Sequence, residues 1–226
     1  MISLKNISKI YGSGSAATTV LHGISLEIEE GEFVAIMGPS GSGKSTLLNI
    51  LGTLDVPSSG EYTFFGTQVG SLSPDQRALF RRYILGFIFQ GYNLLKKTTS
   101  LENVEMPLIY LGIDSKEREH RASEALTDVG LAERLYYDPG QLSGGEQQRV
   151  AIARAMVTLP RILIADEPTG NLDTKRGHEI MQLIRTFNRQ GITVIMVTHE
   201  DEIAAYASRT IYLRDGVIEK EVKHVS

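Results

Sequence analysis

The sequence contains no cysteine among its 226 residues. This absence excludes disulfides, thiolate metal sites and cysteine nucleophiles, and it suits a reducing cytoplasm. The first residues, MISLKN, lack the basic-then-apolar pattern of a signal peptide, so we do not expect export. Apolar runs such as 33–37 and 192–197 are far shorter than the ~20 residues that cross a bilayer. We therefore expect any membrane association to come through a partner.

The chain also lacks a strong charge of either sign. Lys and Arg number 23 against 27 Asp and Glu, which gives a formal net charge of −4. This balance gives no reason to expect a general binder of nucleic acid or of a lipid surface. The length and the 42% hydrophobic content are enough to bury one sizeable core.

Apolar spacing near the N-terminus predicts strands. Alternating apolar residues in 2–4 and in 24–28 are typical of half-buried strands. Residues 33–37 form a continuous apolar run, which predicts a strand covered on both faces. These patterns predict that the opening third of the chain forms strands, with a buried strand at 33–37.

The second half of the chain alternates buried strands with a helix. Residues 162–165 and 192–197 are apolar β-type runs, and 175–189 is helical in character. A strand, helix and strand in this order predict a parallel sheet. Residues 92–158 are predicted to be mainly helical, so this middle segment is interpreted as an insertion into one α/β core.

Residues 38–45 read GPSGSGKS and fit the pattern G-x-x-x-x-G-K-[ST]. The glycines let successive backbone N–H groups point at phosphate oxygens, and the helix beginning near Lys44 adds its positive dipole end. Lys44 would reach the β- and γ-phosphates, and Ser45 would hold Mg²⁺. A chance Gly/Ser loop is a poor alternative, because this loop follows a buried strand and opens an amphipathic helix. That helix is predicted to carry leucines on one side: Leu47, Leu48, Leu51 and Leu54.

The strand predicted at 162–165 ends in two carboxylates, Asp166 and Glu167. Asp166 would anchor the water shell of the magnesium ion, and Glu167 could face the attacking water as general base. On their own, two solvated acids at a strand end would be the better interpretation. The glycine-rich loop upstream makes the functional interpretation stronger.

Residues 142–147 read LSGGEQ and form a second glycine loop that opens a helix. The loop predicts a second anion site in the same chain. An ordinary helix N-cap explains the same residues, with Ser143 as the cap and Glu146 three residues later. The two interpretations are compatible.

LSGGEQ resembles the signature motif of the ABC ATPase family, and the two earlier elements resemble its Walker A and Walker B motifs. The resemblance covers essentially the whole chain in order. It implies an α/β P-loop NTPase (RecA-like) core, about 1–91 and 159–226, with an antiparallel β subdomain. It also implies an inserted helical subdomain at about 92–158. ATP and Mg²⁺ are the implied cofactors, and ATP hydrolysis is the implied activity.

The resemblance also assigns residues that spacing alone does not. Gln90 resembles the Q-loop glutamine that touches Mg²⁺ and the water, and His199 resembles the switch histidine that holds the γ-phosphate. Together with Glu167 and Lys44 they form the implied catalytic set. Ser45, Gln90 and Asp166 are the implied metal contacts. The implied nucleotide contacts are Tyr11, which would stack on adenine, and Gly38, Pro39, Ser40, Gly41, Ser42, Gly43, Lys44, Ser45, Thr46, Gln90, Ser143, Gly144, Gly145, Glu146 and Asp166.

In relatives the signature loop closes over the nucleotide of a second subunit, so the resemblance implies an ATP-induced, head-to-tail homodimer. An integral-membrane permease is the other implied partner, which would place the chain peripherally on the cytoplasmic face of the inner (cell) membrane. The stretch 79–108 matches the permease-docking region of the family. Within it we expect Tyr92, Leu94 and Leu95, which follow Gln90, to form an exposed apolar patch.

Local stretches at 49–55, 86–90 and 165–173 resemble the branch with lipoprotein-releasing and macrolide-exporting ATPases, and also cell-division and antimicrobial-peptide resistance ATPases. A soluble ABC protein of translation or DNA repair usually has two cassettes or a coiled-coil insertion. The short segment between Gln90 and Leu142 shows no sustained heptads. A GTPase or nucleotide kinase would leave the second glycine loop unexplained, and the chain has no Asn-Lys-x-Asp motif.

Overall fold

The computed structural model describes residues 1–224, and the chain divides into two compact units. The first unit combines residues 1–81 with the segment that begins at Thr193, and the second comprises residues 82–192. Helix α2 (Pro74–Ile84) carries the chain from the first unit into the second. Among the described residues, no helix combines the length and the apolar character needed to cross a membrane.

An antiparallel sheet in the order β2-β1-β4-β5 opens the first unit. Ile2, Leu4 and Ile7 on β1 are buried, as the alternation of apolar and polar residues predicted. The antiparallel β region expected near the N-terminus is therefore confirmed. The strand bounds are β1 (Ile2–Tyr11), β2 (Thr18–Ile28), β4 (Ser59–Phe64) and β5 (Thr67–Gln68).

The first unit also holds a mainly parallel group of strands. β3 pairs in parallel with β8 on one side and β9 on the other, and β10 runs antiparallel to β9. All residues of β3 and β8 are buried, as their continuous apolar character predicted. Helix α1 packs against β8 and β2, and α7 packs against β3. The bounds are β3 (Phe33–Met37), β8 (Thr193–Val197), β9 (Arg209–Arg214), β10 (Val217–Lys223), α1 (Lys44–Leu51) and α7 (Asp201–Ala204).

Helix α1 begins at Lys44, as predicted, but it is shorter than its leucine pattern indicated. Leu47, Leu48 and Leu51 are buried, whereas Leu54 is 50% exposed. The helix ends at Leu51, and the chain then turns through Thr53, whose φ is 55°. The prediction for Leu54 was wrong because a helical spacing was extended past the end of the helix.

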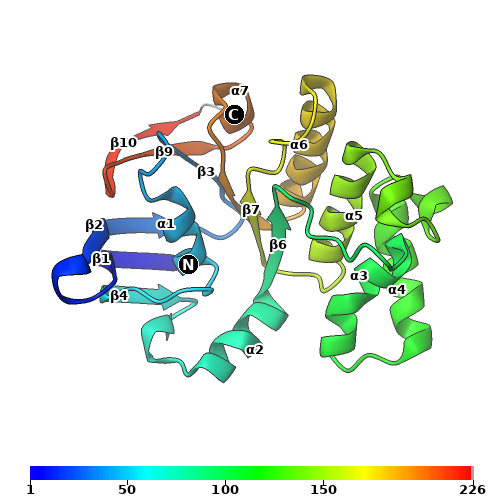
Figure 1. Cartoon of the computed structure of the whole chain (residues 1–226), viewed down its shortest axis with the longest axis horizontal. Coiled ribbons are helices and arrows are strands. Elements are labelled where there is room, and N and C mark those ends of the chain that lie inside the picture. Colours follow the sequence, from blue (N-terminus) through cyan, green and yellow to red (C-terminus); the bar gives the residue numbers. More distant parts are fainter. Residues whose placement is uncertain (225–226) are drawn as a thin grey trace. The chain divides into compact units, whose positions relative to one another are not determined.

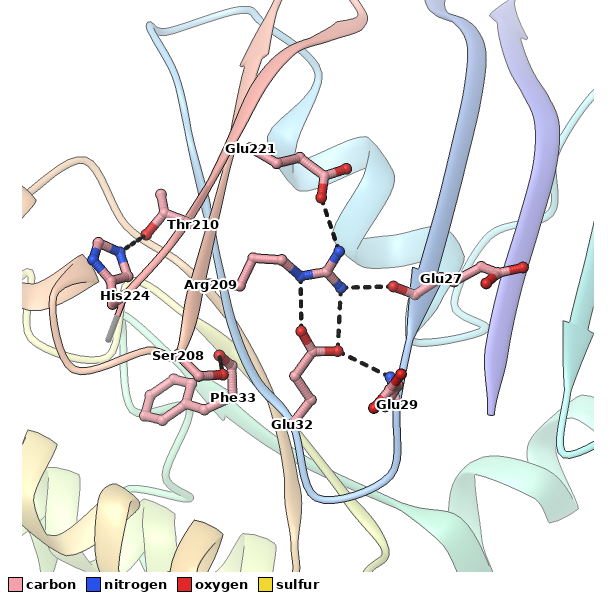
Figure 2. Close-up of polar contacts among 9 residues, drawn as sticks. All are labelled: Glu27, Glu29, Glu32, Phe33, Ser208, Arg209, Thr210, Glu221 and His224. Atoms are coloured by element: carbon pink, nitrogen blue, oxygen red, sulfur yellow. Dashed lines mark hydrogen bonds and ion pairs between the residues drawn. The ribbon is translucent and has the colours of Figure 1, made fainter. Parts of the chain in front are cut away.

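Arg209, the first residue of β9, joins three segments of the first unit (Figure 2). Its Nε and Nη2 donate to the two Glu32 carboxylate oxygens at 2.7 and 3.1 Å. Nη2 also donates to the Glu27 carbonyl at 2.6 Å, and Nη1 donates to Glu221 Oε2 at 2.9 Å. These contacts tie β2 and β10 to the turn that precedes β3. β3 leads directly into the glycine-rich loop. The contacts of Arg209 therefore help to hold the start of the strand that precedes this loop.

The second unit contains a parallel strand pair and a helical cluster. β6 pairs with β7, α5 packs on β6, and α6 contacts α5. Helices α3, α4 and α5 contact one another and form one cluster in the green part of the chain (Figure 1). The bounds are β6 (Leu85–Phe89), β7 (Ile162–Asp166), α3 (Ser100–Tyr110), α4 (Ser115–Asp128), α5 (Gly144–Met156) and α6 (Thr174–Arg189). Short 3₁₀ helices complete the chain: η1 (Gly14–Ala16), η2 (Val69–Ser71), η3 (Ala132–Arg134) and η4 (Pro139–Gln141).

Side-chain caps explain where the helices of the second unit begin. Thr99 caps α3 and forms a capping box with Glu102, and Asp114 caps α4. Asp173 caps α6 by accepting from the Arg176 N–H.

The second unit includes β6, β7 and α6 as well as the three clustered helices, so the subdomain limits at 92 and 158 stay a prediction.

Candidate functional site

The glycine-rich loop lies between β3 and α1 in the first unit, and two of its glycines are dictated by backbone geometry. Gly38 has a φ of 150°, and a Cβ there would collide with the Leu213 carbonyl oxygen. Gly43 has a φ of 98°, and a Cβ there would lie 2.8 Å from Leu21 Cδ2. Side chains are excluded at both positions, so the curl of the loop follows from the sequence.

The loop presents donors suited to an anion. The N-cap of α1 is Gly43, which supplies no side-chain cap to the helix N–H groups. The Ser42 hydroxyl is buried and has no hydrogen-bond partner within residues 1–224. Lys44 Nζ donates to the Gly38 and Pro39 carbonyls at 2.8 Å each, which places an ammonium over the loop. Uncapped amides, a helix dipole and an ammonium in one loop fit the phosphates of a nucleotide.

Tyr11 and His199 belong to the same unit as the glycine-rich loop. Tyr11 ends β1, is 41% exposed, and donates its hydroxyl to Asp55 Oδ2 at 2.7 Å. Burial and then the Asp55 hydrogen bond raise the pKa of the Tyr11 phenol. His199 is exposed and follows β8 by two residues. Because Ile36 on β3 pairs with Val197 on β8 in a parallel register, His199 and the glycine-rich loop leave the same edge of these strands.

The second unit brings Gln90, Asp166 and Glu167 to one strand edge. Phe89 pairs with Asp166 in the parallel β6–β7 ladder, so Gln90 and Glu167 are the next residues beyond a matched pair. Asn171 Nδ2 donates to the Gln90 carbonyl at 2.7 Å. The loop after the two carboxylates therefore contacts the residue that the sequence singled out as the Q-loop glutamine.

Glu167 has a left-handed backbone conformation, with a φ of 45°. This conformation costs a non-glycine residue roughly 1–2 kcal/mol. Such strain persists only where surrounding structure imposes it, and it is concentrated at functional sites. Asp166 is the last residue of β7, so the left-handed turn begins directly after the strand.

The second glycine loop begins α5, and Ser143 is the N-cap. The Ser143 N–H and hydroxyl donate to Glu146 Oε2 at 2.9 and 2.8 Å, and the Glu146 N–H donates back to Ser143 Oγ at 3.4 Å. Arg134 Nε donates to the other Glu146 oxygen at 3.1 Å. The backbone N–H of Ser143, then its hydroxyl and Arg134, lower the pKa of Glu146 below its usual range. The capping-box interpretation of this loop is confirmed.

Helix α5 also contacts the segment that follows Gln90. Arg154 Nη1 and Nη2 donate to the carbonyls of Asn93 and Tyr92 at 2.6 and 2.8 Å. Both residues have left-handed backbones, with φ values of 51° and 59°. Gln148 Nε2, which is buried, donates to the Pro168 carbonyl at 2.8 Å. Sequence reasoning missed Arg154 and Gln148, because nothing in the motif indicates what their side chains contact.

Tyr92 was expected to form an exposed docking patch, and the structure gives it contacts within the chain. It is only partly exposed, and a Cβ at Gly144 would lie 2.9 Å from its hydroxyl. The hydroxyl also lies 3.5 Å from the Asn171 carbonyl oxygen. Leu95, by contrast, is 46% exposed, as expected. Tyr92 therefore contacts the segments around Gly144 and Asn171, and of these two residues only Leu95 fits the expected exposed patch.

The glycine-rich loop, the buried strand before it and the helix after it define a P-loop NTPase. The family model described as ABC transporter matches residues 21–170. The chain therefore belongs to the ABC transporter family and is one of its ATP-binding ATPase domains, with the α/β core and antiparallel β subdomain that the sequence predicted.

Individual relatives agree with this assignment. An uncharacterized ABC transporter ATP-binding protein of Methanocaldococcus jannaschii, MJ1508, is 56% identical over 218 residues, or 96% of this chain and 97% of that protein. The macrolide export ATP-binding/permease protein MacB of Chlorobium luteolum is 53% identical over 218 residues. The match covers 96% of this chain but only 33% of that protein, so the chain spans about one third of MacB.

A solved structure resembles the whole chain. It is a dimeric post-hydrolysis state of the ATP-binding cassette MJ0796 bound to ADP and Pi. The TM-score is 0.92 at 46% identity, with full coverage of both chains. The fold assignment therefore extends over the complete sequence rather than over the motifs alone.

Proposed function

We propose that this chain binds MgATP, hydrolyses it, and drives an export-type membrane permease. The observation that carries the proposal is the anion-binding glycine-rich loop, with its uncapped helix and its lysine, in a member of the ABC transporter family. Similarity to MacB, which is named for macrolide export, supports an export role. The cargo classes that we propose are lipoproteins, drugs or antimicrobial peptides. The permease would hold the chain on the cytoplasmic face of the inner membrane.

Positioning and electrostatics account for the proposed reaction. The N–H groups of the glycine-rich loop and Lys44 would bind the phosphates. Glu167 would accept a proton from the attacking water, and His199 would hold the γ-phosphate. Ser45, Gln90 and Asp166 offer the oxygen ligands that Mg²⁺ prefers, and the bound ion would neutralise phosphate charge.

We further propose that two copies assemble head to tail around ATP. The dimeric MJ0796 structure supports this arrangement for a chain of the same fold. The signature loop would then meet the phosphates bound by the partner copy. Because the Ser143 hydroxyl donates to Glu146 in the isolated chain, contact with a phosphate requires this hydroxyl to exchange acceptors.

The experiment is a steady-state ATPase assay on the full chain with and without Mg²⁺. Lys44→Ala should abolish turnover, and Lys116→Ala, which removes an exposed lysine on α4, should not. Mixing Lys44→Ala with Ser143→Arg should restore part of the activity, because one intact composite site can form. Strict first-order dependence of wild-type activity on protein concentration, through the range of dissociation, would contradict the dimeric site.

A further inference from the structure

A buried charge lies beside Tyr11. Lys9 is 8% exposed although it lies on a strand whose other inward residues are apolar. Its Nζ donates to Asp55 Oδ1 at 2.6 Å and to the Val56 carbonyl at 2.8 Å. The second oxygen of the same carboxylate accepts from the Tyr11 hydroxyl at 2.7 Å. Asp55 therefore holds Lys9 and Tyr11 at once, through separate oxygen atoms.

Lys9 also contacts the aromatic ring directly. The two residues are separated by one position on β1, so their side chains share a face of the strand. Lys9 Nζ lies over the Tyr11 ring, 4.8 Å from its centroid, within the range of a cation–π contact. The ammonium covers one face of the ring, while the Tyr11 residue as a whole is 41% exposed.

Asp55 lies in a loop that is fixed at both ends. Its N–H donates to the Asn49 carbonyl of α1 at 3.1 Å. A few residues later, the Ser58 N–H donates to the Ser8 carbonyl of β1 at 2.8 Å. Because α1 begins at the glycine-rich loop, the Asp55 carboxylate is placed relative both to that loop and to Tyr11.

Asp55 keeps its charge in this setting. Burial alone raises the pKa of its carboxyl group, but hydrogen bonds from Lys9, Tyr11 and the Val56 N–H outweigh burial and hold the pKa below its usual range. The carboxylate is therefore ionised at neutral pH and accepts from both side chains. A buried lysine is tolerated only with such a partner.

We infer that Asp55 and Lys9 are positioning residues of the base-binding site, which hold the Tyr11 ring ready to stack on a purine. The inference rests on the proposed function, in which Tyr11 contacts adenine. A ring fixed before binding loses less freedom when the base arrives. The ammonium also draws π-electron density toward its own face, and the opposite face then suits an electron-rich purine.

The test separates base binding from phosphate binding. Dissociation constants of the full chain for MgADP and for magnesium pyrophosphate are measured by titration calorimetry; pyrophosphate reports the glycine-rich loop without a base. Tyr11→Ala should weaken MgADP about tenfold, as expected for one aromatic stack. Asp55→Asn and Lys9→Met should each weaken MgADP about three- to tenfold. Pyrophosphate binding should change less than about twofold on the same reasoning, and Glu61→Gln, an exposed carboxylate on β4, should change neither ligand.

A double mutant shows whether the residues act through the ring. Adding Asp55→Asn to Tyr11→Ala should cost nothing further, because the ring being positioned is already absent. Tyr11→Phe keeps the ring and the Lys9–Asp55 pair and removes only the hydroxyl, so it should weaken MgADP about threefold without unfolding the chain. This variant decides the question if Asp55→Asn does not fold.

Failure of the inference differs from failure of the proposed base site. If Tyr11→Ala leaves MgADP affinity unchanged, Tyr11 does not bind the base, and the inference falls with that assignment. If Tyr11→Ala weakens MgADP while Asp55→Asn and Tyr11→Phe do not, only the positioning role is refuted. Equal losses for MgADP and pyrophosphate in Asp55→Asn, or additive losses in the double mutant, would also overturn it.

Discussion

Removing the Arg154 side chain should loosen the segment that follows Gln90. Its guanidinium donates to two consecutive carbonyls, those of Tyr92 and Asn93, at 2.8 and 2.6 Å. These two residues have left-handed backbones, which cost roughly 1–2 kcal/mol each when nothing holds them. Arg154→Met keeps a long apolar stem and removes both donors. The backbone there should then relax toward ordinary conformations.

The size of the effect follows from the two hydrogen bonds. A hydrogen bond from a charged group contributes about 1.5–3 kcal/mol. Asn93 is exposed, so water can replace much of its bond, whereas Tyr92 is only partly exposed. We therefore expect a net loss of about 2 kcal/mol in the local opening free energy, which corresponds to roughly 30-fold faster amide exchange.

Hydrogen exchange measured by mass spectrometry over residues 90–95 checks this expectation. Arg154→Lys should give an intermediate rate, because an ammonium lacks the planar fork that reaches two carbonyls. Arg185→Met, an exposed arginine on α6, is the matched control and should leave exchange unchanged. Turnover should fall in Arg154→Met, because Gln90 is a proposed contact of the metal and the water. Unchanged exchange over 90–95 in Arg154→Met would refute the reasoning.

The other predictions concern catalysis, stability and pH. Glu167→Gln should keep nucleotide affinity and slow ATP turnover by roughly 10²–10⁴-fold, as measured by binding and phosphate-release assays, because it removes the proposed base. Arg209→Met should lower the free energy of unfolding in urea by about 2–3 kcal/mol, because Glu32, whose side chain is 18% exposed, loses the guanidinium. The hydrogen bonds that lower the pKa of Glu146 stabilise the folded state at pH values above the pKa of this carboxyl group in the unfolded chain, about 4.3. That contribution is lost as pH falls through the folded pKa, so the stability difference between wild type and Glu146→Gln should shrink below about pH 4 in urea titrations.

The strands and helix starts that the sequence predicted are those that are determined by residues close to them in the sequence. The run at 33–37 is apolar without interruption, and every residue of β3 is buried. On β1, by contrast, buried residues are interspersed with exposed ones, as its mixed apolar and polar sequence indicates. The starts of α1 and α5 follow from glycines and a capping serine next to the helices. The loop at 38–45 is only partly local in cause. Gly38 and Gly43 have positive φ values, but the atoms that exclude a Cβ there belong to Leu213 and Leu21, which are distant in the sequence.

Contacts that depend on the tertiary fold were beyond the reach of such patterns. Lys9 and Asp55 are 46 positions apart, and Tyr92 and Arg154 are 62 apart. Neither pair leaves a periodic or motif-like trace in one sequence. From the sequence alone, a lysine on a strand such as Lys9 is interpreted as an exposed charge. Its burial becomes understandable only when the structure shows its partner, Asp55. The same limit applies to Tyr92. The sequence predicts it in an exposed apolar patch, whereas in the structure its hydroxyl lies beside Gly144.

The two glycine loops of this chain differ in how their helices begin, and that difference bears on when each can meet a phosphate. At α1 the N-cap is Gly43, the first turn holds no acidic residue, and the Lys44 ammonium contacts the same loop, so the site suits an anion. At α5 the N-cap is Ser143, and a Glu146 carboxylate already accepts its N–H and its hydroxyl. A phosphate approaching α5 must compete with this carboxylate, whose own charge opposes a second anion. The α1 loop is thus suited to hold nucleotide in a single chain, whereas α5 requires an additional driving force, which docking of a second nucleotide-loaded copy would supply.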